Sequence, residues 1–134
     1  MKEKEREMSQ SGCYELLASL MLRAHGSLQE VKFIEKTRNF VLVFGDGTEL
    51  EPNTEYKRGK WYKNHLELVS EFVDAGYGGD PLDVLSFGYS GTGSNNLAVL
   101  IKACGFENAS AVTSGENFNE LPVVLRPDGK FYGD

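Results

Sequence analysis

An unbroken apolar run followed at once by a tight-turn signal constrains the fold more than any other feature of the sequence. The run is Phe40-Val41-Leu42-Val43-Phe44, and the turn signal is Gly45-Asp46-Gly47. Because every position of the run is apolar, both of its faces should be covered, which predicts a central strand of a sheet. The Asp-Gly pair is typical of a hairpin, so the chain should return as a strand over Thr48–Glu51.

The neighbouring segments extend this hairpin into a sheet. Val31–Glu35 has strand composition, and Thr37-Arg38-Asn39 supplies a turn into the apolar run, which predicts a three-stranded meander. Near the C-terminus, Pro127-Asp128-Gly129 predicts the turn of a second hairpin. The C-terminal strands are expected at Ala111–Thr113, Leu121–Leu125 and Lys130–Tyr132.

About three helices are expected beside the sheet, which makes the chain α+β with a mostly antiparallel sheet. Apolar residues recur at helical spacing over 14–24, 64–75 and 97–104, each followed by a glycine that can end the helix (Gly26, Gly76 and Gly105). Asn64 and Glu67 form a capping box for the second helix. Leu82–Phe87 fits either a strand or a short helix capped by Asp80, and the strand is favoured.

Length and composition fit one domain over residues 1–134, with residues 1–10 as a frayed or helical leader. Hydrophobic residues make up 40% and charged residues 25% of the 134 positions, as in ordinary globular proteins. This composition excludes a disordered chain, a collagen-like chain and a strongly basic nucleic-acid coat. At this size one hydrophobic core can form without a disulfide or metal.

Charge is divided unevenly between the two halves. Residues 1–65 carry 11 basic and 10 acidic groups, whereas residues 66–134 carry 3 basic and 10 acidic groups. An acidic second half repels phosphate backbones, so nucleic acid is disfavoured as a partner. The charge serves solubility in the first interpretation and recognition of a basic protein partner in the second.

The sequence predicts a cytoplasmic protein. Residues 1–10 lack the apolar region of a signal peptide, and no stretch approaches the ~18 apolar residues of a membrane-spanning helix. Cys13 and Cys104 occur without a CxxC pattern, which suits free thiols in a reducing compartment. A disulfide between the two is the alternative.

The candidate binding site is a glycine-rich loop just before the helix expected at 97–104. A helix N-terminus presents unpaired N–H groups, and glycines let an anion approach them closely. Serine, threonine and asparagine side chains add further donors. The candidate ligand-binding residues are Gly88, Ser90, Gly91, Thr92, Gly93, Ser94, Asn95 and Asn96. The alternative is a glycine turn capped by Ser94 or Asn95, which needs no ligand.

Known phosphate-binding and catalytic motifs do not fit this loop. Gly88 and Gly93 have the GxxxxG spacing of a P-loop, but Ser94 stands where that motif has lysine. The glycine order also differs from the GxGxxG of dinucleotide-binding folds and from the GxSxG elbow of hydrolases. Nucleoside triphosphate hydrolysis is therefore not expected.

The segment Phe87–Ala98 resembles a signature of uncharacterised bacterial and phage proteins, approximately W-G-Y-G-G-S-G-P-x-Q-L-A. Phe87 replaces the tryptophan, Ser90 a glycine and Thr92 a serine, while Ser94 replaces the proline and Asn96 the glutamine. No activity is assigned to that family, so the resemblance implies only a shared loop-helix unit.

A second candidate segment, Tyr56–Lys63, combines aromatic and basic side chains. Aromatic rings stack on bases and cations pair with phosphates, so Trp61 and Lys60 are candidate helpers of the glycine-rich loop. The alternative is a solvated loop whose Trp61 packs on the core while its lysines reach solvent.

The sequence contains no recognisable catalytic set, and enzyme status stays open. His25 and His65 have no Cys, Asp or Glu at metal-ligand spacing, so neither a metal nor a cofactor is expected. Asp80 and Asp83 fit an acid/base pair or, more simply, helix and turn caps. The first interpretation is a non-catalytic binding or accessory protein with an anion or nucleotide-phosphate site. The alternatives are an enzyme acting on a phosphorylated substrate and an acidic module that binds, inhibits or mimics another protein.

Overall fold

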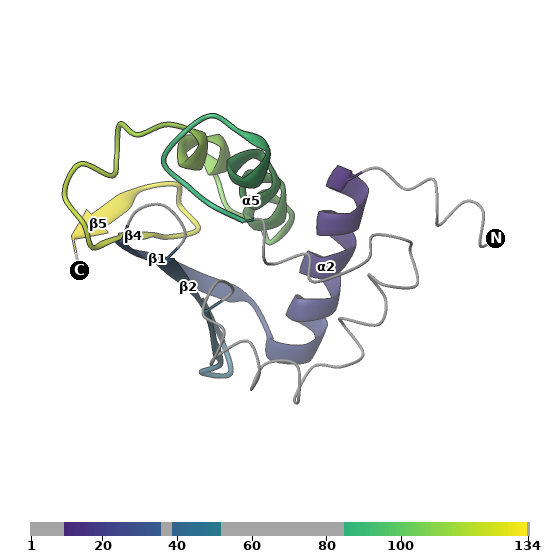
Figure 1. Ribbon diagram of the computed structural model, residues 1–134. Coiled ribbons are helices and arrows are strands. Elements are labelled where there is room, and N and C mark those ends of the chain that lie inside the picture. The colour runs from purple at the N-terminus through teal and green to yellow at the C-terminus, as the bar shows by residue number, and fades with distance from the viewer. Residues whose placement is uncertain (1–9, 36–38, 52–84, 134) are drawn as a thin grey trace.

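The computed structural model describes residues 10–35, 39–51 and 85–133. It confirms an α+β fold around one five-stranded antiparallel sheet in the order β3-β2-β1-β4-β5. The strands are β1 (Leu28–Glu35), β2 (Asn39–Phe44), β3 (Glu49–Leu50), β4 (Val123–Leu125) and β5 (Phe131–Gly133). The helices of the described part are α2 (Gln10–His25), α5 (Thr92–Ala103) and the 3-10 helix η2 (Ala109–Thr113). The two α-helices cover the same face of the sheet, with α5 above β1 and β4 (Figure 1).

The N-terminal meander is confirmed, with one correction to its place in the sheet. The Gly45-Asp46-Gly47 turn closes with a 2.9 Å bond from the Phe44 amide to the Thr48 carbonyl, and Gly47 takes a positive φ of 89°. The segment predicted as the central strand, β2, pairs on both edges, but β1 is the middle strand of the five. The reason is that β4, from the far end of the chain, pairs with the second edge of β1.

Two of the three expected α-helices lie in the described part of the chain. As expected, α2 ends at Gly26, which has a φ of 84° and donates its amide to the Leu22 carbonyl at 2.9 Å. The helix expected over 64–75 and the first two residues of the turn at 37–39 lie outside the described residues. The third expected helix is α5, which begins earlier than its apolar face, at Thr92.

The C-terminal hairpin is confirmed, whereas the strand predicted at Ala111–Thr113 is wrong. The hairpin joins β4 to β5 through a turn in which Gly129 has a φ of 81°. Residues 109–113 form η2 instead, because the Ala111 amide bonds back to the Asn108 carbonyl at 3.0 Å and Val112 is fully buried. Residues 85–87 are irregular rather than a strand.

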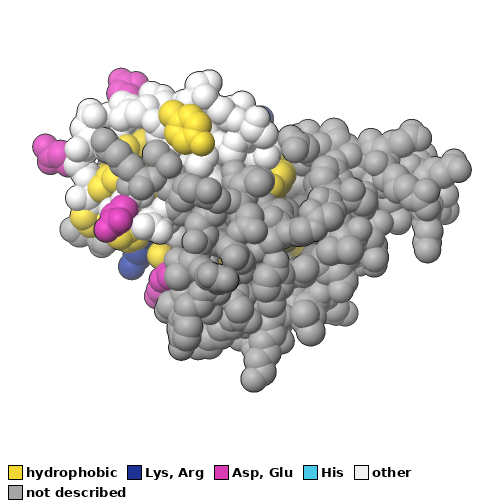
Figure 2. Space-filling model, in the orientation of Figure 1, with side chains coloured by type: hydrophobic (Ala, Val, Ile, Leu, Met, Phe, Trp, Pro, Cys, Tyr) yellow, Lys and Arg dark blue, Asp and Glu magenta, His cyan; other side chains and the backbone are white. Residues whose placement is uncertain are grey.

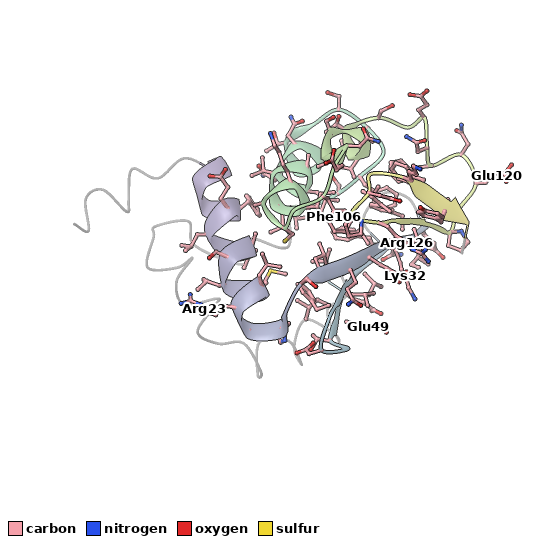
Figure 3. All side chains as sticks on the ribbon, turned by 180° about the vertical axis from the view of Figure 1, so that it is seen from behind. Arg23, Lys32, Glu49, Phe106, Glu120 and Arg126 are labelled. Carbon is pink, nitrogen blue, oxygen red and sulfur yellow. The ribbon has the colours of Figure 1, made fainter. Side chains whose placement is uncertain are left out.

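Phenylalanine rings form the centre of the core between helices and sheet. Phe87 is fully buried, with its ring centroid 4.6 Å from that of Phe33 and 4.9 Å from that of Phe118. Charged side chains such as Arg23 and Lys32 point outward (Figure 3). Because Phe87 immediately precedes the glycine-rich loop, that loop starts from a fixed point in the core.

Candidate functional site at the N-terminus of α5

The N-terminus of α5 has no side-chain cap. Gly91 is the N-cap residue, in an extended conformation with φ −176° and ψ 175°, and no side chain bonds to the cap. The first intrahelical bond runs from the Asn95 amide to the Gly91 carbonyl at 2.9 Å. The N–H groups of Thr92, Gly93 and Ser94 therefore precede the hydrogen-bond ladder of the helix, as the first amides of any helix do.

This geometry removes the ligand-free alternative in which Ser94 or Asn95 caps the helix. Both residues lie inside α5, with Ser94 fully buried and Asn95 exposed. A cap must have non-helical backbone angles, which these positions do not have. Glycine at the cap position offers no side-chain oxygen, and no acidic residue of the first turn offsets the positive end of the α5 dipole.

Gly88, the first residue of the predicted loop, is held by the protein itself. Its amide donates to the Val112 carbonyl of η2 at 2.8 Å, and its φ of 87° suits glycine. A Cβ added at Gly115 would lie 3.2 Å from the Gly88 carbonyl oxygen, so this part of the loop is closely packed. The Gly88 amide is engaged, and the open donors lie further along, from residue 92 onward.

A small cluster of hydroxyl groups supports the first turn of α5. The Ser86 hydroxyl donates to the Tyr89 hydroxyl at 2.9 Å, and the oxygens of Ser86 and Ser94 are 3.5 Å apart. Ser86 is 3% exposed, whereas Tyr89 is 46% exposed. Sequence reasoning missed Ser86 and Tyr89 as site residues, although an aromatic residue between two loop glycines was the available signal.

The side chain of Asn96 is buried with an unused donor. Asn96 is 5% exposed, and its Nδ2 has no hydrogen-bond partner. Helical side chains lean toward the N-terminus and cover the preceding turn, so this amide lies over the turn containing Thr92 and Gly93. Buried donors are nearly always paired, which makes the unused Nδ2 a donor suited to an acceptor oxygen beside Gly93.

The structure brings together only part of the predicted site. Gly91, Thr92, Gly93 and Ser94 form the cap and first turn of α5, with Asn96 one turn later. Ser90 and Asn95 are exposed beside them. The other predicted participants lie outside the described residues; these are Lys60, Trp61, His65, Asp80 and Asp83.

A separate polar cluster joins the C-terminal end of α2 to the β2–β3 hairpin. The Nδ1 atom of His25 lies 3.0 Å from the Asp46 carboxylate and 3.2 Å from the Thr48 hydroxyl. Hydrogen bonds from Thr48, together with His25, lower the pKa of Asp46 to about 2. These two contacts fall on the same ring nitrogen, whereas the two partners of the histidine in a catalytic triad use opposite nitrogens.

Three other features bear on the sequence-based expectations. Cys104 is a free thiol, and burial raises its pKa to about 12. Within residues 10–35, 39–51 and 85–133, no group of three or more His, Cys, Asp or Glu side chains can hold a metal ion. In the same ranges no helix has the length and apolarity to cross a membrane.

Comparison of the chain with protein-family models, curated proteins and solved structures finds no match. Function therefore has to be argued from the geometry of the site.

Proposed function

We propose that this chain is a small cytoplasmic binding protein, without catalysis of its own, that holds a phosphate-type oxyanion at the N-terminus of α5. The observation that carries the proposal is the uncapped first turn, where Gly91 is the N-cap and no side chain occupies the cap. Free N–H groups and the positive end of the helix dipole together form the common anion site of helical proteins. The loop-helix unit that resembles the bacterial and phage signature is this same segment.

The surroundings of the first turn favour an anion over a cation. No acidic residue occurs in the first turn of α5, and the neighbouring side chains are hydroxyl and amide groups. Ser94 and Asn96 are both buried, so a ligand oxygen that reaches them would be partly removed from water. Hydrogen bonds to charged groups are stronger under those conditions.

The other functions considered from the sequence have no support in the described residues. An enzyme would draw on His65, Asp80 and Asp83, which lie outside the described residues. An acidic interaction module would draw mainly on the five acidic groups of residues 66–84, which lie outside the described residues, whereas residues 85–133 carry four acidic and three basic side chains. Among the described residues, the acidic side chains on the face shown in Figure 2 are dispersed.

The substitution Thr92→Pro tests the proposal by deleting a single backbone donor. Proline is favoured at the first position of a helix because the N–H there is unpaired, and the extended Gly91 has the conformation preferred before proline. The variant should therefore fold. We expect inorganic phosphate to bind it about tenfold more weakly, since a hydrogen bond to a charged group contributes about 1.5–3 kcal/mol.

Titration calorimetry with phosphate, at ionic strength matched with chloride, measures this effect. The matched control is Thr92→Ala, which removes the exposed hydroxyl but keeps the amide, and it should bind phosphate far better than the proline variant. Equal affinities of Thr92→Pro and Thr92→Ala would contradict the proposal. So would a wild-type chain that does not distinguish phosphate from chloride.

A further inference from the structure

The exposed ring beside the uncapped helix end narrows the class of ligand. On the basis of the function proposed above, we propose that Tyr89 is a stacking platform and that the ligand is a phosphomonoester carrying a flat ring, as in a nucleoside monophosphate. This arrangement uses no aromatic residue other than Tyr89 among the described residues, and Trp61 lies outside them. The argument rests on where the Tyr89 ring lies, how much of it is open and which donors surround it.

The ring of Tyr89 lies directly against the N-cap residue. A Cβ added at Gly91 would come within 2.7 Å of Cε2 of Tyr89, so the ring occupies the space beside the cap. Its hydroxyl is tethered to buried Ser86 at 2.9 Å. The ring therefore lies beside the N-cap residue, which directly precedes the first-turn amides.

Tyr89 is also unusually open for an aromatic residue in this structure. Its exposed fraction is 46%, and Ile34 is the one other large hydrophobic side chain exposed among the described residues. The described phenylalanines at the centre of the core, by contrast, pack on one another. An open ring next to phosphate-binding donors is the combination that proteins use to hold nucleotides, with the base stacked and the phosphate on backbone amides.

Asn96 supplies an observation independent of the helix end. Its buried Nδ2 has no partner, and the residue one turn before it on the same side of α5, Gly93, has no side chain. Pairing with an acceptor oxygen of the ligand would satisfy this donor. A phosphomonoester has more acceptor oxygens than the first-turn amides can use, and one of them can pair with Asn96.

The test is calorimetric titration of the full chain with inorganic phosphate, ribose 5-phosphate and adenosine 5′-monophosphate. We expect the adenosine compound to bind at least about fivefold more tightly than ribose 5-phosphate, in line with base–aromatic stacking of about 1–3 kcal/mol. In Tyr89→Leu this advantage should disappear, so that adenosine 5′-monophosphate and ribose 5-phosphate bind with about equal affinity. Tyr89→Trp should keep the advantage, which guards against a folding defect in the leucine variant.

The matched control is Tyr132→Leu. It removes a tyrosine of β5 whose ring packs against Arg126, and it should leave all three affinities unchanged. Equal binding of ribose 5-phosphate and adenosine monophosphate would overturn the role of Tyr89 but leave the phosphate site intact. The same holds if Tyr89→Leu keeps the full advantage of the adenosine compound. A wild-type chain that binds none of the three compounds overturns both proposals.

Discussion

The two ends of α5 differ in whether their terminal backbone groups are hydrogen-bonded. At the C-terminal end, the Gly105 amide bonds to the Lys102 carbonyl at 2.9 Å and the Phe106 amide to the Ile101 carbonyl at 3.1 Å. This is the Schellman pattern, with glycine in the left-handed region and an apolar residue packing back. At the N-terminal end, Gly91 provides no cap and an exposed tyrosine lies beside it. The closed end pairs its last carbonyls within the chain, whereas the open end leaves its first-turn amides without a side-chain cap.

The largest change in stability should come from a substitution at the closed, C-terminal end of α5. Phe106 is 4% exposed and joins the core cluster, so Phe106→Ala should lower the free energy of unfolding by about 3–5 kcal/mol. Urea unfolding followed by circular dichroism measures the loss. Glu107→Ala, at the next and exposed position, is the control and should change stability by less than about 0.5 kcal/mol. If Phe106→Ala lowers the free energy of unfolding by less than about 1 kcal/mol, packing does not close this end of the helix.

Gly105→Ala isolates the backbone contribution at the same end. Gly105 has a φ of 94° and nothing within 4 Å of an added Cβ, so the cost should be conformational strain alone, about 1–2 kcal/mol. Gly133→Ala is the control, because its added Cβ also meets nothing and its φ is not positive. If both alanines have the same effect in urea unfolding, the left-handed conformation at residue 105 contributes nothing.

The same contrast explains what the sequence could predict. Gly105 followed by Phe106 is a local pattern typical of a helix end, with a glycine stop and an apolar residue that packs back. The end of α5 was therefore predicted correctly. The start was predicted later than Thr92, because Ser94 and Asn95 are strong capping residues and Gly93 is a poor helix former. Packing determines where the helix begins, since Ser94 is fully buried with its hydroxyl beside that of Ser86. The helix therefore starts at Thr92, before Ser94 and Asn95.

Long-range pairing accounts for the other differences. The strand composition of β1, the apolar run of β2 and the Asp-Gly turn are local features, and the meander was predicted from them. Nothing local indicates that β4 pairs with β1, which makes β1 the middle strand. Likewise, Ala111–Thr113 has strand-like side chains, but the Val112 carbonyl serves the Gly88 amide and the segment forms η2. The contact between Tyr89 and Gly91 depends on the bend of the loop, which composition does not specify.

At the open end we expect a smaller change in stability, and a gain instead of a loss. Asn96→Leu replaces the side chain with the unpaired buried Nδ2 by an apolar one of the same heavy-atom branching, so the free energy of unfolding should rise by about 1 kcal/mol. The same variant should bind phosphomonoesters more weakly, because the Nδ2 donor is gone. The control for stability is the exposed neighbour, Asn95→Leu, which should leave the free energy of unfolding nearly unchanged. A destabilised Asn96→Leu protein would show that the amide is satisfied in solution and is not held for a ligand.

The smallest effect tests whether Tyr89 occupies the place of a cap. Serine is a better N-cap than glycine by a few tenths of a kcal/mol, so Gly91→Ser should stabilise α5 if the cap position were empty. The Tyr89 ring lies 2.7 Å from the added Cβ, and it must move before the serine fits. We therefore expect no gain from Gly91→Ser alone but a gain of about 0.5 kcal/mol in a Tyr89→Ala background. Urea unfolding of the four proteins of this cycle measures the coupling. If the stability effects of Gly91→Ser and Tyr89→Ala are simply additive, the Tyr89 ring does not influence the cap position. The open end of α5 would then be an ordinary glycine cap with an exposed tyrosine nearby.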